Sequence, residues 1–203
     1  MTMQWYTLAL EAWEGMLLRV VILLVLIWLV LWLMNRHYRT EQEKRSERLQ
    51  KQYAVLTRET LDALPDEELT EAVIANLNAK QDKKQPDPYT TLPLLSHERV
   101  LVYAVWLIHQ ELDSGDFDTL FASPSRQFCE YAAEGLDECG APECAAAVRR
   151  ALGTSDEAEL ADCHASYVEA AEREHPTAGL IAYIRDNADA LCDRETEDNG
   201  YEP

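Results

Sequence analysis

The stretch Val100–Ile108, VLVYAVWLI, decides the fold of this 203-residue chain. All of its residues are apolar or aromatic, so a helix over them is apolar on nearly every face. Such a helix is surrounded by other helices, as the central helix of a bundle. The chain is rich in Ala, Leu and Glu and has only seven Gly and eight Pro, which favours helices over a turn-rich β fold. The sequence therefore predicts an all-α domain around this helix.

Signals for the ends of the central helix lie close to the apolar stretch. Ser96 can cap its N-terminus, and Gly115 can supply the left-handed residue that ends it. Asp116 can then cap a short helix whose apolar side chains return to the core. These side chains are Phe117, Leu120 and Phe121.

Five more helices are expected around the central one. They cover about 65–80, 126–138, 142–152, 154–175 and 177–192. Thr154 and Glu157 form a capping box, and Pro176 separates the last two helices. Residues 82–95 are a proline-rich connection, and 193–203 form an acidic tail that is expected to be disordered. The acidic helical domain thus covers 61–192.

A second apolar stretch precedes this domain. Residues 20–34 read VVILLVLIWLVLWLM, and a helix extended back to Met16 reaches about 28 Å, close to the thickness of a bilayer core. We expect a transmembrane helix over 16–34, a short extracytoplasmic N-terminus over 1–15 and a charged helical stalk over 35–60. A cleaved signal peptide and a buried soluble helix are the alternatives, and Glu11 and Glu14 disfavour the first.

Basic residues beside this segment predict its orientation. Only Arg19 lies at its start, whereas six lie just after it. They are Arg36, Arg39, Lys44, Arg45, Arg48 and Lys51. The expected location is therefore the inner (cytoplasmic) membrane, single-pass, with the N-terminus outside, the domain in the cytoplasm and the lipid bilayer contacted through Met16–Met34.

The net charge of −19 is unevenly distributed. Residues 1–60 hold eight Lys/Arg and six Asp/Glu, whereas the remainder holds 10 Lys/Arg and 31 Asp/Glu. Such a charge repels phosphate backbones and attracts basic proteins, so no direct nucleic-acid binding is expected. The alternative is a solvated acidic surface that only confers solubility.

Motifs for metals, cofactors and catalysis are incomplete in this sequence. The five cysteines, at positions 129, 139, 144, 163 and 192, fit a reducing compartment and buried core positions better than a zinc site. Residues 113–118 have carboxylates but lack the spacing of a calcium loop, and a turn between helices explains them. His97 and Glu98 lack the second histidine of a zinc-protease motif. The sequence predicts no metal and no cofactor, and an enzyme of unrecognised type remains an alternative.

The stretch Ser96–Arg126, SHERVLVYAVWLIHQELDSGDFDTLFASPSR, resembles the bacterial DNA-mimic-like family. In that family a helix with acidic and apolar residues at its end meets an Asn-Asn-Gly-Gly-Phe turn, then a Phe-Phe pair and a Ser-rich loop. The matching positions are Asp113, Ser114, Gly115, Asp116 and Phe117, then Leu120 and Phe121, then Ser123–Arg126. Both asparagines and the second glycine are replaced here, whereas Gly115 and Phe117 keep the structural parts of the turn.

The segments EELTEAVIANL and AAEGLDECGAP also resemble this family, so the resemblance covers about 61–190. It implies an all-helical fold whose function is mostly unknown. It also implies that some members present carboxylates like a DNA backbone and occupy the nucleic-acid surface of a regulator.

The leading hypothesis is a membrane-anchored, non-catalytic domain that binds a protein partner, basic or nucleic-acid-binding, through an acidic face. The spacing of Glu130, Glu134, Asp137 and Glu138 places much of their charge on the outer side of one helix. The alternative is a DNA mimic that blocks a nucleic-acid-binding protein.

Overall fold

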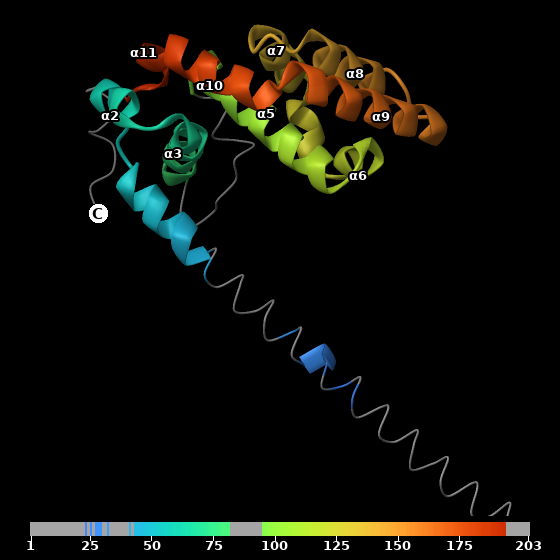
Figure 1. The fold of residues 1–203 in the computed structure, drawn as a ribbon, viewed down its shortest axis with the longest axis horizontal. Coiled ribbons are helices and arrows are strands. Elements are labelled where there is room, and N and C mark those ends of the chain that lie inside the picture. Colours follow the sequence, from blue (N-terminus) through green and yellow to red (C-terminus); the bar gives the residue numbers. More distant parts are fainter. Residues whose placement is uncertain are drawn as a thin grey trace, which may run out of the picture. The chain divides into compact units, whose positions relative to one another are not determined.

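A computed structural model of the chain describes residues 43–81 and 95–193, together with residues 23, 25, 27–29, 32 and 41. The chain divides into two compact units, Met1–Arg48 and Leu49–Pro203. The second unit contains the acidic domain, whose helices are labelled in Figure 1. The described residues include helices and no strand, which confirms the predicted all-α class.

The predicted location in the inner membrane is wrong, because no helix of the described residues is long and apolar enough to cross a bilayer. A spanning helix needs about 20 predominantly apolar residues. The two longest described helices in the second unit, α5 (His97–Ser114) and α9 (Glu157–Glu174), have 18 residues each and carry several charged side chains. Most of the segment 16–34, with its expected bilayer contact, and all of 1–15 lie outside the described residues.

α5 is the central helix of the second unit, as its apolar stretch predicts. Nine of its residues are buried, and Trp106 and Leu107 are the half-buried members of Val100–Ile108. Ser96 caps the helix, because its hydroxyl accepts a hydrogen bond from the Arg99 N–H at 3.4 Å. The predicted start of this helix is confirmed.

The other helices pack around α5 in two groups (Figure 1). On one side α7 packs on α5, α8 packs on α7, and α9 packs on α8 and α6. On the other side α3 and α10 pack on α5 and on each other, and α11 packs on α5 and α2. Their bounds are α2 Arg58–Ala63, α3 Asp66–Ala79, α6 Phe117–Ala122, α7 Cys129–Glu138, α8 Pro142–Leu152, α10 Pro176–Asp186 and α11 Ala188–Leu191. A 3₁₀ helix, η2, covers Pro124–Phe128.

Several helix ends differ from the sequence prediction. Gly115 ends α5 with φ −149° and ψ −147°, and not in the left-handed conformation that was predicted. α9 is capped by Asp156, which accepts from the Glu159 N–H at 3.0 Å, and not by Thr154. The helix predicted over 177–192 is divided at Asn187 into α10 and α11. Each difference is confined to a helix end, so the apolar face of each helix still points toward the core.

The predicted stalk over 35–60 ends earlier than expected. A helix covers 43–52, and the chain then turns before α2. Tyr53 and Leu56 are buried in the domain core, with exposed fractions of 3% and 0%. Their burial against the domain explains why the helix does not continue. The connection 82–94 and residues 194–203 lie outside the described residues.

Candidate functional site

The four acids predicted to bind a partner lie on α7. Glu130, Glu134, Asp137 and Glu138 are all exposed. The opposite side of α7 is buried, because five small or apolar residues face the core. They are Cys129, Ala132, Ala133, Gly135 and Leu136. Gly135 allows close packing on α5, since a Cβ there would lie 2.6 Å from Val105 Cγ2. Tight packing of the inner side thus presents the acids outward.

Two of these four acids are paired within the protein. Glu134 Oε1 lies 2.9 Å from Nε2 of His97, at the start of α5. Asp137 Oδ2 accepts from Nη2 of Arg149 on α8, and the same nitrogen also donates to the Ala133 carbonyl. Among the described residues, no ion-pair partner contacts Glu130 or Glu138. These two carboxylates therefore keep their charge available to a partner.

The acids extend beyond α7 toward α5 and α10. Burial, the largest cause, and the nearby charges of Glu98, Glu138, Cys139 and Glu134 together raise the pKa of Tyr183 on α10 to about 12. Glu98 of α5 thus acts on the same tyrosine as Glu134 and Glu138 of α7. We call Glu98, Glu130, Glu134, Asp137 and Glu138 the acidic face.

Sequence reasoning missed part of this arrangement. His97, Glu98 and Tyr183 are far from α7 along the chain, so no helical spacing could link them to it. The ring of Tyr131 lies edge-on to that of His97, with centroids 6.5 Å apart. Tyr131 is also 36% exposed, so the face includes an aromatic side chain beside its carboxylates.

Most arginine side chains of the domain form ion pairs with its own carboxylates. Residues 95–193 contain 20 Asp/Glu against six Arg and no Lys. Five of the six arginines bind carboxylates. The pairs are Arg99 with Asp193, Arg149 with Asp137, Arg150 with Asp162, Arg173 with Glu143 and Glu169, and Arg185 with Asp66. The sixth, Arg126, lies 4.9 Å from the ring centre of Phe121. The acid excess therefore dominates the surface potential.

The family-motif turn from Asp113 to Phe117 is structural. Asp116 Oδ1 accepts from the Thr119 N–H at 2.8 Å, and the bonds from Thr119 hold the pKa of the Asp116 carboxyl below its usual value. Ser114 Oγ donates to the Gln110 carbonyl, whereas Asp113 is exposed. Phe117 is fully buried.

Four of the five cysteines belong to the core. Cys129, Cys139, Cys144 and Cys163 are buried, and all five thiols are free. Burial raises the pKa of the Cys129, Cys139 and Cys144 thiols to about 12. In the part of the chain that the structure describes, no group of three or more His, Cys, Asp or Glu side chains could hold a metal ion. These thiols pack as small apolar groups.

The fold and the acidic face define a small, acidic, all-helical domain. A family model described as DMP19-like protein matches residues 94–198, more than half of the chain. The chain therefore belongs to the DMP19-like protein family, which confirms the predicted resemblance to DNA-mimic-like proteins. The matched residues begin just before α5, later than the predicted 61. Searches of curated proteins and of solved structures returned no significant match.

Proposed function

We propose that this protein is a DNA mimic, which occupies the nucleic-acid-binding surface of another protein with its own carboxylates. Membership of the DMP19-like family supports this function over the other hypotheses. Proteins that bind duplex DNA contact its phosphates with Lys and Arg side chains. A rigid domain with many exposed carboxylates competes for the same cations.

The observation that carries the proposal is the internal pairing of the arginines. Because Arg149, Arg150, Arg173 and Arg185 are bound to acids of the same chain, they offer little repulsion to a basic partner. Glu130 and Glu138 keep their charges exposed on α7. A partner therefore meets an acidic surface whose cations are already neutralised.

The acidic face also offers contacts that a phosphate backbone lacks. Tyr131 lies among the acids of α7 and is 36% exposed, and tyrosine contributes strongly at protein interfaces. Charge brings the two proteins together, and the aromatic contact favours some partners over others. Such a protein acts by covering the nucleic-acid-binding surface of its partner, and it needs no catalytic group.

Competition with duplex DNA tests this function. The full chain, immobilised, is used to capture proteins from a cell lysate, and the complex is then challenged with duplex DNA. A DNA mimic is expected to capture a nucleic-acid-binding protein and to release it to duplex DNA. Polyglutamate of equal total charge is the control, and it should release much less, because its charges lack the spacing of phosphates.

Two pairs of substitutions test whether the partner binds to the acidic face. The double substitution Glu130→Gln and Glu138→Gln should reduce capture about tenfold, since each exposed charge contributes a fraction of the binding free energy. The control pair, Glu157→Gln and Glu172→Gln on α9, removes two exposed acids outside the acidic face. A captured protein that saturating duplex DNA leaves bound would rule out mimicry of DNA.

A further inference from the structure

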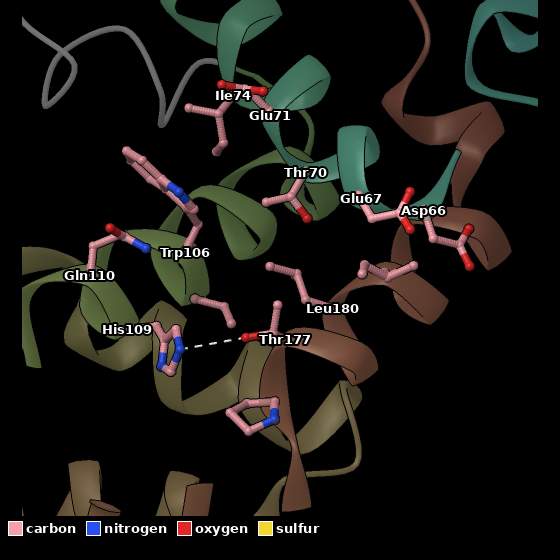
Figure 2. Close-up of a pocket in the computed structure, with 13 residues that line it drawn as sticks. Asp66, Glu67, Thr70, Glu71, Ile74, Trp106, His109, Gln110, Thr177 and Leu180 are labelled. Atoms are coloured by element: carbon pink, nitrogen blue, oxygen red, sulfur yellow. Dashed lines mark hydrogen bonds between the residues drawn. The ribbon is translucent and has the colours of Figure 1, made fainter. Parts of the chain in front are cut away.

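A pocket that shares no lining residue with the acidic face lies between α3, α5 and α10 (Figure 2). Its volume is about 590 Å³, which is within the range of pockets that bind small organic molecules. The three helices belong to the same compact unit and contact one another. Because its walls are helices that pack on a common core, the pocket is built in advance of any ligand, which lowers the entropy lost on binding.

The floor of the pocket is apolar. Ile74 of α3, Val105 of α5 and Leu180 of α10 line it and are buried. Trp106 of α5 lines it too and is half-buried, so part of this side chain remains for a ligand to cover. A flat aromatic ligand can stack on the indole ring or meet its edge while it covers the aliphatic side chains.

One hydrogen-bonding atom of the α3 wall is unused. Thr70 Oγ1 is shielded from water and has no hydrogen-bond partner in the part of the chain that the structure describes. A threonine hydroxyl within a helix can bond to the carbonyl one turn earlier, and this one does not. Figure 2 shows the Thr70 side chain pointing from α3 toward the space between Trp106 and Leu180. A ligand that donates a hydrogen bond would satisfy this oxygen.

Other polar groups of the lining have partners within the protein. His109 Nε2 lies 3.4 Å from Thr177 Oγ1, the contact drawn in Figure 2, and His109 Nδ1 lies 3.3 Å from the Tyr167 hydroxyl. The carboxylate of Asp66 binds Arg185 at 2.8 Å. Among the described residues of the lining, the neutral hydroxyl of Thr70 is therefore the buried polar group left for a ligand.

The charge around the pocket disfavours an anionic ligand. Glu67 lines the pocket and is exposed, and no lysine or arginine is among the described lining residues. Residues 95–193 also hold 20 Asp/Glu against six Arg, so an approaching anion is repelled. An ion of either sign also loses its hydration at the apolar floor. A neutral molecule avoids both costs.

We propose that this pocket binds a neutral aromatic molecule of about two to three rings that carries a hydrogen-bond donor. Its rings pack between Trp106 and the aliphatic floor, and its donor group bonds to Thr70 Oγ1. This binding site is a second function of the domain. It does not depend on DNA mimicry, because the pocket and the acidic face have no residue in common.

Three probes with the same ring system test the inference on the full chain. At about pH 7, 2-naphthol is neutral and donates a hydrogen bond, 2-fluoronaphthalene has nearly the same size but no donor, and 2-naphthoate is an anion. Binding is followed by the NMR signal of the Trp106 indole N–H, assigned as the signal that Trp106→Phe removes. The affinity for 2-naphthol should exceed that for 2-fluoronaphthalene about fivefold or more, and that for 2-naphthoate about tenfold or more.

Substitution of Thr70 separates the role of its hydroxyl from that of the apolar floor. Thr70→Val keeps the shape of the side chain and removes the hydroxyl, so 2-naphthol should lose its advantage over 2-fluoronaphthalene. In the control Thr119→Val, the substituted threonine lies on α6, is exposed and does not line the pocket, so the preference should remain. Circular dichroism checks that each variant is folded.

The outcomes decide the inference without reference to DNA. A Trp106 signal that 2-naphthol leaves unchanged up to its solubility limit would overturn it, as would a comparison probe that binds as tightly as 2-naphthol. A preference for 2-naphthol that survives in Thr70→Val would also overturn it. Loss of the preference in Thr70→Val, together with its retention in Thr119→Val, supports the proposed site.

Discussion

Asp193 connects distant parts of the domain through one carboxylate. Its Oδ1 binds Nη2 of Arg99 and Nζ of Lys80, both at 2.7 Å. Its Oδ2 accepts from the Leu56 N–H at 2.8 Å and from Asn76 Nδ2 at 3.0 Å. The side chains of Arg99 and Asp193 are only 3% and 9% exposed. The sequence placed Asp193 in a disordered tail, because no local pattern relates it to residues 56–99.

The substitution Asp193→Asn should lower the free energy of unfolding by about 3 kcal/mol, because it leaves the buried Arg99 guanidinium without its counter-charge. Urea unfolding followed by circular dichroism measures the change. Asp189→Asn is the control, since Asp189 is 89% exposed and pairs with Arg58 at the surface. Equal unfolding midpoints for the two variants would contradict the role given to Asp193.

The contribution of Asp193 to the free energy of unfolding should also depend on pH. Burial raises the pKa of this carboxyl, but bonds from Lys80, Leu56, Asn76 and Arg99 together hold it below the ordinary 3.8. A carboxyl with a lowered folded-state pKa stabilises the protein above its unfolded pKa and loses that effect as the pH falls through the folded value. The stability difference between the wild type and Asp193→Asn should be constant between about pH 5 and 7 and should narrow below about pH 4.

At the scale of elements, helix ends are the features most readily predicted. The caps Ser96 and Asp116 act within three residues along the chain, so their sequence signals are sufficient. The break at Asn187 carries no such signal. α2 does carry one, because the Thr57 side chain accepts from the Thr60 N–H at 3.2 Å, but the predicted stalk over 35–60 ran across it. Both features occur where Leu61, Ala188 and Leu191 turn into the core, which only the packing of several helices decides.

Gly179 allows α10 to approach the end of α7 closely. A Cβ at this position would lie 2.0 Å from the Cys139 carbonyl oxygen, so the two backbones must separate in Gly179→Ala. This substitution should lower the free energy of unfolding by about 2 kcal/mol. Thermal or urea unfolding measures it. In the control Gly153→Ala the nearest atom lies at 3.4 Å, and a change below about 1 kcal/mol is expected.

At the scale of the whole molecule, charge is the main feature relevant to binding. The domain's 20 acids and six arginines over 95–193 give it a strong negative potential, which salt screens within about 8 Å at physiological ionic strength. Capture of the partner should weaken at least about tenfold between about 0.05 M and about 0.5 M NaCl. The affinity of the Glu130→Gln and Glu138→Gln double variant for the partner should decrease less steeply with NaCl concentration. An affinity that is independent of salt would contradict recognition by charge.

The sequence by itself determined the all-α class, the central helix at Val100–Ile108, the family and the acidic character of the domain. These properties depend on composition and on neighbours within a few residues, which can be read along the chain. The same reasoning gave the wrong cellular location, because an apolar stretch was taken as a membrane span that no described helix provides.

Only the tertiary structure decided which acids lie together and which cations they neutralise. His97 meets Glu134 of α7, Asp193 enters the core, and Trp106 and Glu67 line one pocket because helices distant in sequence pack on α5. The physical reason is that a pairing between helices depends on how their apolar faces fit, a property of the packed core as a whole and not of any single segment.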